Sequence, residues 1–210
     1  MTYNFIAIEG NIGSGKTSLA RKMANGQDTK IILEQFDDNP FLTKFYIDNE
    51  KYAFPLELSF LAERYQQLKR EGSNFDLFKN LIISDYYFYK SLIFAKANLG
   101  EEEFKLYSKL FHIIYDSLPK PDLLIYLYLD INNLQKNIAQ RGRSYEQNIS
   151  DDYLIKIQTT YIDYLKQQQH IRILCLDVNN IDFVHKPNDY QKLINTIQLD
   201  YPLGFNKVIL

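Results

Sequence analysis

The sequence contains no tryptophan and only one cysteine, and it has no apolar run long enough to cross a membrane. A lone cysteine cannot form an internal disulfide, and Cys175 lies in the apolar stretch IRILCLD, where we expect it to be part of the core. The first apolar run, residues 5–8, is too short for a signal peptide and has no basic flank. We therefore expect a cytoplasmic protein without internal disulfides.

A strong excess of charge of either sign is also missing. The 24 basic and 26 acidic residues leave a net charge of −2, which predicts no electrostatic attraction to nucleic acid or to a membrane. The three histidines are scattered and do not have the spacing of a metal-ligand set. The chain has no internal repeat, and its 210 residues are enough to bury one full core. We expect a single domain covering residues 1–210.

Short apolar runs rich in β-branched residues alternate with longer amphipathic segments. The runs predict strands at residues 5–9, 30–34, 81–85, 123–130 and 171–177. Helical periodicity predicts helices that start at Gly15, cover 53–69, follow Asp85, fill 101–118, follow Asp130, fill 151–169, and start at 186 before an extended tail. This alternation is typical of a three-layer α/β fold, with a parallel sheet of about five strands and helices on both faces.

A phosphate-binding loop follows the first predicted strand. Residues 10–17 match the pattern G-x-x-x-x-G-K-[ST], and a helical pattern follows. Glycines let the backbone wrap phosphates, and the start of a helix adds positive partial charge. Lys16 should reach the β- and γ-phosphates, and the Thr17 hydroxyl should bind Mg²⁺. We predict that ATP or another nucleoside triphosphate binds, with Mg²⁺, at Gly10, Asn11, Ile12, Gly13, Ser14, Gly15, Lys16, Thr17 and Ser18.

Three predicted strands end in a carboxylate, at Glu9, Glu34 and Asp85. Because parallel sheets place their sites at the carboxyl ends of strands, we expect Glu34 and Asp85 to lie close to the phosphate loop. One carboxylate can accept the proton of an attacking hydroxyl group, and another can hold Mg²⁺. Each carboxylate taken alone is equally compatible with a strand-end cap or a solvated turn residue.

Two arginines, Arg141 and Arg143, lie just past an amphipathic helix, in a candidate lid region at about residues 137–149. Arginines on a mobile segment can close over a transferring phosphoryl group and neutralise its charge, although a solvated basic turn is the alternative. The segment DINNLQ, after the fourth strand, lacks the N-K-x-D element with which a regulatory GTPase reads guanine. A phosphotransferase is therefore favoured over a switch protein.

Two charged residues border the apolar stripe of the helix predicted at 53–69. Glu57 and Arg64 are two turns apart and lie on nearly the same face. A buried charge is costly unless it is paired with another charge or binds a ligand. The alternative is that both side chains extend from the edge of the stripe into water. A carboxylate only accepts hydrogen bonds, which suits the two adjacent donors of guanine, whereas adenine and cytosine each present one donor beside an acceptor. If Glu57 and Arg64 bind a base, they therefore favour guanine.

These residues together resemble the deoxynucleoside kinase family, P-loop enzymes that phosphorylate the 5′-OH of deoxyribonucleosides. The resemblance implies that Arg141 and Arg143 are lid arginines, that Asp85 lies near Mg²⁺, and that the chain forms a homodimer through a helix bundle. It covers nearly the whole chain, in the segments GNIGSGKTS, DNPFLTKFY, YAFPLELSFLAERYQQL, LIISDYYFYKSLIFAKANL, LPKPDLLIYL and RGRSYEQNIS.

The same resemblance implies roles on the side of the phosphate acceptor. Glu34 matches the general base that takes the 5′-OH proton, and Tyr46 and Glu146 match the pair that holds the sugar 3′-OH. Arg64 matches an arginine that contacts the base, and Phe94 matches an aromatic residue that packs on it.

The chain departs from the family pattern at three places. Most members carry glutamine at the position of Glu57, and arginine at the position of Tyr86, directly after the acidic residue. The segment from Asp85 to Phe94 is also shorter, which leaves the alignment of Lys90 open, although Lys90 or another cation can replace the missing arginine. Glutamate together with the D-Y-x-x-Y-K segment is similar to the bacterial deoxyguanosine kinase branch, in agreement with the guanine argument.

The sequence thus predicts a deoxyguanosine kinase that uses ATP or another nucleoside triphosphate with Mg²⁺. A broader deoxynucleoside kinase that accepts deoxyadenosine, deoxycytidine or thymidine is the first alternative. A thymidylate-type monophosphate kinase would need further cations for the phosphate of its acceptor. A P-loop binding protein would hold a nucleotide but transfer no phosphate.

Overall fold

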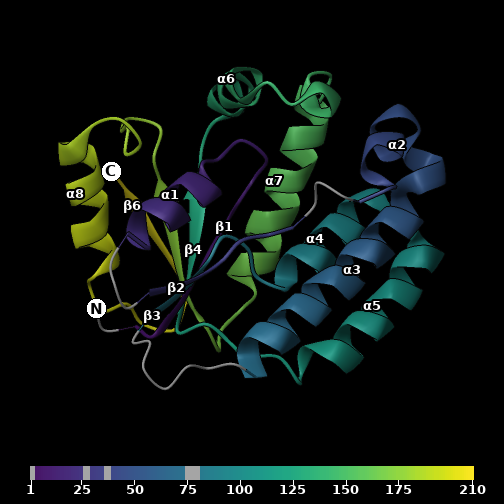
Figure 1. Cartoon of the computed structure of the whole chain (residues 1–210), viewed down its shortest axis with the longest axis horizontal. Coiled ribbons are helices and arrows are strands. Elements are labelled where there is room, and N and C mark those ends of the chain that lie inside the picture. The colour runs from purple at the N-terminus through teal and green to yellow at the C-terminus, as the bar shows by residue number, and fades with distance from the viewer. Residues whose placement is uncertain (1–2, 26–28, 36–38, 74–80) are drawn as a thin grey trace.

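A parallel sheet forms the centre of the protein. Its computed structural model describes residues 3–25, 29–35, 39–73 and 81–210, so Asp38, the first residue of the DNPFLTKFY segment, lies outside the described residues. The sheet has the strand order β2-β3-β1-β4-β5-β6, and every neighbouring pair is parallel (Figure 1). The strands are β1 Phe5–Gly10, β2 Thr29–Ile32, β3 Leu81–Ser84, β4 Leu123–Tyr128, β5 Arg172–Asp177 and β6 Gly204–Ile209.

Helices cover both faces of the sheet, which confirms the predicted three-layer α/β fold. Figure 1 shows α3, α4, α5 and α7 on one side and α1 and α8 on the other. None of the described helices is both long enough and apolar enough to span a bilayer. The helical elements are α1 Lys16–Met23, α2 Leu42–Ile47, α3 Asn49–Ser73, α4 Tyr89–Asn98, α5 Glu101–Tyr115, α6 Ile131–Arg141, the 3₁₀-helix η1 Ser144–Glu146, α7 Asp151–Lys166 and α8 Pro187–Ile197.

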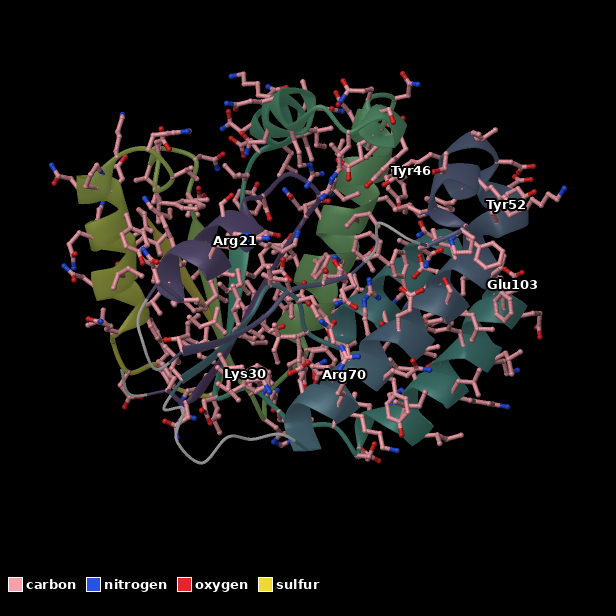
Figure 2. All side chains as sticks on the ribbon, in the orientation of Figure 1. Arg21, Lys30, Tyr46, Tyr52, Arg70 and Glu103 are labelled. Carbon is pink, nitrogen blue, oxygen red and sulfur yellow. The ribbon has the colours of Figure 1, made fainter. Side chains whose placement is uncertain are left out.

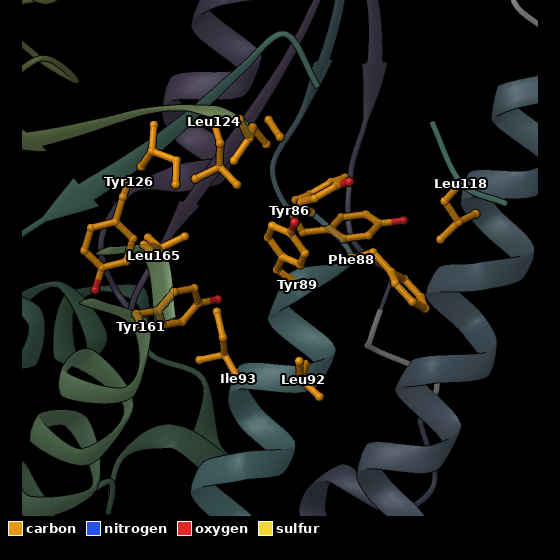
Figure 3. Packing of buried hydrophobic residues seen from close by; sticks show 14 of the residues in the cluster. Tyr86, Phe88, Tyr89, Leu92, Ile93, Leu118, Leu124, Tyr126, Tyr161 and Leu165 are labelled. Atoms are coloured by element: carbon orange, nitrogen blue, oxygen red, sulfur yellow. The ribbon is translucent and has the colours of Figure 1, made fainter. Parts of the chain in front are cut away.

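The core is divided by the sheet, because successive side chains of a strand point to opposite faces. Phe5 and Ala7 of β1 pack into the cluster under α3, α4, α5 and α7, together with Cys175, which is buried as predicted. Ile6 and Ile8 of the same strand pack into the cluster on the other face. Figure 3 shows part of the first cluster, where aromatic rings and leucines fill the space between sheet and helices. Every residue of β1 is buried, which fixes the position of the phosphate loop that follows it.

The sixth strand is a correction to the predicted count of about five. The tail after α8 pairs with β5 in register, from Arg172 opposite Gly204 to Asp177 opposite Ile209. This edge strand is only partly buried and lacks the continuous apolar run that reveals a central strand. Tertiary pairing therefore makes a strand that the local pattern does not indicate.

Helix α3 begins earlier than predicted, at Asn49 instead of residue 53. The Asp48 carboxylate accepts a hydrogen bond from the Lys51 backbone N–H at 3.2 Å, a capping contact that stabilises the earlier start. Pro55 consequently lies inside the helix. The short helix α2, which has too few residues for a periodic signal, packs against α3 through Phe45 and Phe60.

Candidate active site

The phosphate loop joins β1 to α1 and takes conformations that favour glycine. Gly13 and Gly15 have φ angles of 80° and 88°. A Cβ on Gly13 would lie 2.8 Å from the backbone oxygen of Leu134, so this position has no room for a side chain. Helix α1 begins at Lys16, and its free N–H groups and positive end therefore lie at the loop. These features fit the binding of phosphate.

Lys16 lies across this loop. Its ammonium group donates hydrogen bonds to the backbone oxygens of Gly10 at 2.9 Å and Asn11 at 2.8 Å. Burial and the charge of Lys90 together lower the pKa of Lys16 to about 8, against the opposing effect of Glu9. A phosphate placed here would add negative charge and favour the protonated ammonium.

Two hollows meet at this loop. Their shared wall comprises Lys16, Thr17, Arg141 and Arg143. The first, which we call the acceptor cavity, is lined among others by Ile12, Glu34, Tyr46, Glu57, Arg64, Asp85, Lys90, Phe94 and Glu146. The second, which we call the nucleotide groove, is lined among others by Gly13, Ser14, Gly15, Ser18, Asn133, Asn179 and Phe183. The predicted acceptor-side residues are thus brought together in one cavity, and the shared wall lies where a phosphoryl group would pass.

Gly10 and Asn11 are the two predicted loop residues that line neither hollow. The Asn11 amide donates to the backbone oxygen of Leu154 at 2.8 Å, and its oxygen accepts from the Ile12 N–H at 2.8 Å. We therefore assign the Asn11 side chain to holding the loop against α7. Gly10 turns the backbone tightly, since a Cβ there would lie 2.8 Å from the Leu127 oxygen.

Asp85 links the phosphate loop to Glu34, in agreement with the prediction that both carboxylates lie close to this loop. Its carboxylate accepts from the Thr17 hydroxyl at 2.5 Å and from the Glu34 backbone N–H at 2.7 Å. A hydroxyl beside a carboxylate suits Mg²⁺, which prefers oxygen ligands and keeps several from phosphate and water. Among the described residues, no group of three or more His, Cys, Asp or Glu could hold a metal.

Glu34 lies two residues beyond the end of β2, and both of its oxygens are bound to cations. Arg64 donates to one oxygen through Nε at 2.9 Å and Nη2 at 2.7 Å, and Lys90 donates to the other at 2.5 Å. Burial acts to raise the pKa of Glu34, but Lys90 and Arg64 outweigh it and lower the pKa to about 2. Glu34 is therefore a carboxylate at every physiological pH.

Lys90 donates to Glu34, whereas Tyr86, at the position of the family arginine, does not contact it by a hydrogen bond. The Tyr86 ring is fully buried, and its hydroxyl donates to the Gln67 side chain at 2.8 Å, toward α3. Lys90 lies on the first turn of α4 and points to Glu34. The substitution at residue 86 thus leaves Glu34 with two cationic partners.

Glu57 and Arg64 are both buried, with 2% and 4% of their surface exposed, so the alternative that they extend into water is wrong. They are not joined to each other by a hydrogen bond. Arg64 donates to Glu34 and to Ser91, whereas Glu57 accepts from the Asn98 amide at 2.7 Å. Burial raises the pKa of Glu57, and with the opposing effects of Arg64 and Asn98 included the pKa is about 7.

Tyr46 of α2 and Glu146 of η1 both line the acceptor cavity. The Tyr46 ring stacks on Tyr145 with centroids 5.9 Å apart, and Figure 2 shows Tyr46 between α2 and α7. Glu146 accepts hydrogen bonds from Arg141 and, at 3.4 Å, from Arg143. The two predicted lid arginines therefore line both the nucleotide groove and the acceptor cavity, and in the cavity they contact Glu146.

The sequence prediction missed several lining residues, above all Asn98. Lys90, Phe94 and Asn98 follow one another at intervals of four and share one face of α4, so the signal is present in the sequence. No pattern distinguishes Phe183, which lines the nucleotide groove from the loop after β5.

Comparisons with known proteins identify the family. The deoxynucleoside kinase family model matches residues 6–200. The deoxyguanosine kinase of Bacillus subtilis (strain 168) is 36% identical over 91% of this chain and 95% of its own. The deoxyadenosine/deoxycytidine kinase of the same organism is 30% identical over 92% and 91%. The solved structure of deoxyadenosine kinase from M. mycoides with bound dATP shares the fold, with a TM-score of 0.79 at 23% identity over 93% of this chain and 100% of that one. The chain belongs to the deoxynucleoside kinase family, whose members are phosphotransferases that act on a nucleoside hydroxyl group.

Proposed function

We propose that the chain transfers the γ-phosphoryl group of ATP to the 5′-OH of deoxyguanosine, giving dGMP. The observation that carries this choice of nucleoside is Glu57, a buried carboxyl group on the wall of the acceptor cavity. One of its oxygens accepts from Asn98, and the other has no hydrogen-bond partner among the described residues. Two adjacent donors, such as N1–H and the amino group of guanine, would satisfy both oxygens.

On the nucleotide side, the phosphate loop and Lys16 bind the triphosphate, and Arg141 and Arg143 neutralise charge on the transferring group. Thr17 and Asp85 would hold Mg²⁺, which supplies electrostatic stabilisation of the phosphate oxygens when bound. Lys16, Arg141 and Arg143 lie on the wall shared by both hollows, so they can act on a group that moves from one to the other. Catalysis would then rest mainly on positioning and charge.

On the acceptor side, Tyr46 and Glu146 hold the sugar 3′-OH, and Phe94 packs on the base. Glu34 accepts a hydrogen bond from the 5′-OH and takes its proton as the new P–O bond forms and the bond from the γ-phosphorus to the leaving ADP breaks. The low pKa of Glu34, about 2, makes it an orienting acceptor at first and a base only when the attacking oxygen has become acidic. Arg64 and Lys90 keep the carboxylate in place.

Broader use of deoxynucleosides is the second candidate, because one relative is a deoxyadenosine/deoxycytidine kinase by name. A thymidylate-type kinase is disfavoured because Arg64 and Lys90 both donate to Glu34, so neither is aimed at the phosphate of an acceptor. A P-loop protein without transferase activity is disfavoured by the membership in a family of kinases.

We also propose that the protein acts in the cytoplasm as a homodimer, formed through helices as in the family it resembles. Two apolar side chains of α5, Leu106 and Ile113, are 53% and 77% exposed and lie two turns apart on one face. Such a stripe is suited to burial against a second copy.

The deciding experiment measures phosphoryl transfer from ATP–Mg²⁺ to deoxyguanosine, deoxyadenosine, deoxycytidine and thymidine, and to dGMP and dTMP, in parallel. We expect kcat/KM for deoxyguanosine to exceed the others by about tenfold or more, because a buried polar reader rejects bases that leave it unpaired. A lead for another deoxynucleoside would overturn the guanine assignment and leave the kinase activity in place. Transfer only to a monophosphate would overturn the assigned acceptor.

A further inference from the structure

Glu57 has an unusual environment at the base end of the acceptor cavity. Its Oε1 accepts from the Asn98 amide at 2.7 Å, while Oε2 is buried without a hydrogen-bond partner among the described residues. Its backbone oxygen accepts from the Tyr107 hydroxyl at 3.2 Å, which fixes this part of α3 against α5. An ionised oxygen without a partner is costly to bury, so the carboxyl group gains either from a proton or from a ligand that donates to it.

Charged and titratable groups surround Glu57 on several elements. Arg64 on α3 and Lys90 on α4 bring positive charge, Glu34 after β2 brings negative charge, and burial raises the pKa of Glu57 to about 7. Both cations donate to Glu34, whose single negative charge offsets one of their two positive charges. The tyrosines whose hydroxyl groups interact with the Glu57 charge are Tyr107 on α5, Tyr153 on α7 and Tyr46 on α2. None of these groups forms a close ion pair with Glu57, and this leaves the choice between its two protonation states to a ligand.

The two protonation states present different faces to a base. The carboxylate offers two acceptors, which match the N1–H and amino donors of guanine. The protonated acid offers one donor beside one acceptor, which match the N1 acceptor and the amino donor of adenine. In this respect the acid resembles the glutamine that most family members carry at this position.

We propose that Asn98 and Glu57 form one base-reading unit, in which the proton on Glu57 decides between guanine and adenine. This inference rests on the proposed function, since it assumes that the acceptor is a deoxynucleoside bound in the cavity. Asn98 is a positioning residue: its amide holds Oε1 from α4 and favours the ionised form. Asn98 occupies only one lone pair of Oε1, so Oε2 and the remaining lone pair of Oε1 are left to meet the base.

The first test needs no variant. The ratio of kcat/KM for deoxyguanosine to that for deoxyadenosine is measured from about pH 6 to about pH 8. Guanine binds the ionised form and adenine the protonated form, so this ratio should rise about tenfold for each pH unit. Groups that act on both substrates alike, such as Glu34 and Lys16, cancel in the ratio. A ratio that does not change with pH overturns the inference.

Glu57→Gln removes the titrating group and keeps its shape. We therefore expect a ratio of deoxyguanosine to deoxyadenosine kcat/KM that is constant with pH and lies below the wild-type ratio at about pH 8. The matched control is Glu63→Gln, the same substitution on the same helix at a carboxylate that contacts Asn39 and lies outside the acceptor cavity. That control should keep the wild-type slope. A pH-dependent ratio in Glu57→Gln would assign the titration to another residue and overturn the inference.

Asn98→Ala separates positioning from general packing. Loss of the amide should raise the pKa of Glu57, because its hydrogen bond favours the ionised form. The ratio should then fall by the same factor at every pH while its slope is kept. A merely structural role would weaken both substrates equally and leave the ratio unchanged, and this result would overturn the role of Asn98.

Proton release on binding provides a measurement independent of catalysis. Calorimetric titration of deoxyguanosine near pH 7, in two buffers with different ionisation enthalpies, should show release of part of a proton by the wild type and none by Glu57→Gln. Equal release by both proteins would contradict the inference. If deoxyguanosine leads at every pH with a flat ratio, the inference fails and the proposed function stands. If deoxyadenosine leads throughout while the ratio still climbs, the proposed function fails and the proton-dependent unit stands.

Discussion

At the scale of single residues, Glu34 is the centre of the acceptor cavity. Two hydrogen bonds from Arg64 and one from Lys90 hold its two oxygens. The arrangement keeps the carboxylate ionised and fixes its orientation.

This geometry predicts that Glu34 and Lys90 act as a unit. Glu34→Gln should lower kcat by about 10² to 10⁴, the usual contribution of a general base. Lys90→Met should lower kcat in the wild type but have little further effect in Glu34→Gln, because its partner charge is gone. Steady-state kinetics of the double-mutant cycle measures this coupling. Lys96→Met, at an exposed position on the same helix, is the control. If the two substitutions lower kcat by independent factors that multiply in the double variant, Glu34 and Lys90 do not act as a unit.

At the scale of elements, Glu9 ties the end of β1 to two helical elements. Its carboxyl group accepts from the Tyr87 backbone N–H, just before α4, at 2.6 Å and from the Tyr161 hydroxyl of α7 at 2.9 Å. Burial raises the pKa of Glu9 to about 7, against the effect of Lys90. The start of α4, and with it Lys90, is therefore held to the strand that carries the phosphate loop.

Two neighbouring tyrosines give a sharp test of this junction. Tyr161→Phe should lower the free energy of unfolding by about 1–3 kcal/mol, because it leaves a buried oxygen of Glu9 without its donor. Tyr126→Phe should be neutral or stabilising, since the buried Tyr126 hydroxyl has no hydrogen-bond partner among the described residues. Figure 3 shows both rings in the same cluster, and their centroids are 5.2 Å apart. Denaturant unfolding measures the stability of both variants. Equal losses of stability would show that the hydrogen bond from the Tyr161 hydroxyl to Glu9 is unimportant.

At the scale of the whole molecule, the helical layer of α3, α4 and α5 forms one flank, and the phosphate loop lies at the carboxyl ends of the strands (Figure 1). The acceptor cavity lies between this flank and the sheet, because its lining residues come from α3, α4 and the strand ends. The exposed apolar side chains of α5 lie on the same flank.

The proposed dimer should therefore depend on α5. The double variant Leu106→Arg/Ile113→Arg should sediment as a monomer at micromolar concentration, because two charges would have to be buried in the interface. Analytical ultracentrifugation measures this, with Leu199→Arg, at a 58% exposed apolar residue after α8, as the control that stays dimeric. A wild-type monomer, or a double variant that still dimerises, would contradict the proposed interface.

Local sequence requirements allowed the phosphate loop, the α/β fold class and the strand-end carboxylates to be predicted. The phosphate loop needs glycines, Lys16 and Thr17 in adjacent positions, and the alternation of apolar runs with amphipathic segments follows from burying strands between helices. The strand-end positions of Glu34 and Asp85 were likewise predictable, because parallel strands bring their carboxyl ends to one edge.

Only the tertiary structure decided which distant side chains meet. The pairing of Arg64 with Glu34 instead of Glu57, and the contact of Asn98 with Glu57, join residues at least 30 positions apart. The sixth strand likewise depends on hydrogen bonds to β5 more than on its own half-buried sequence. Periodicity determines the face of an element on which a residue lies, but the packing of one element against another determines its partner.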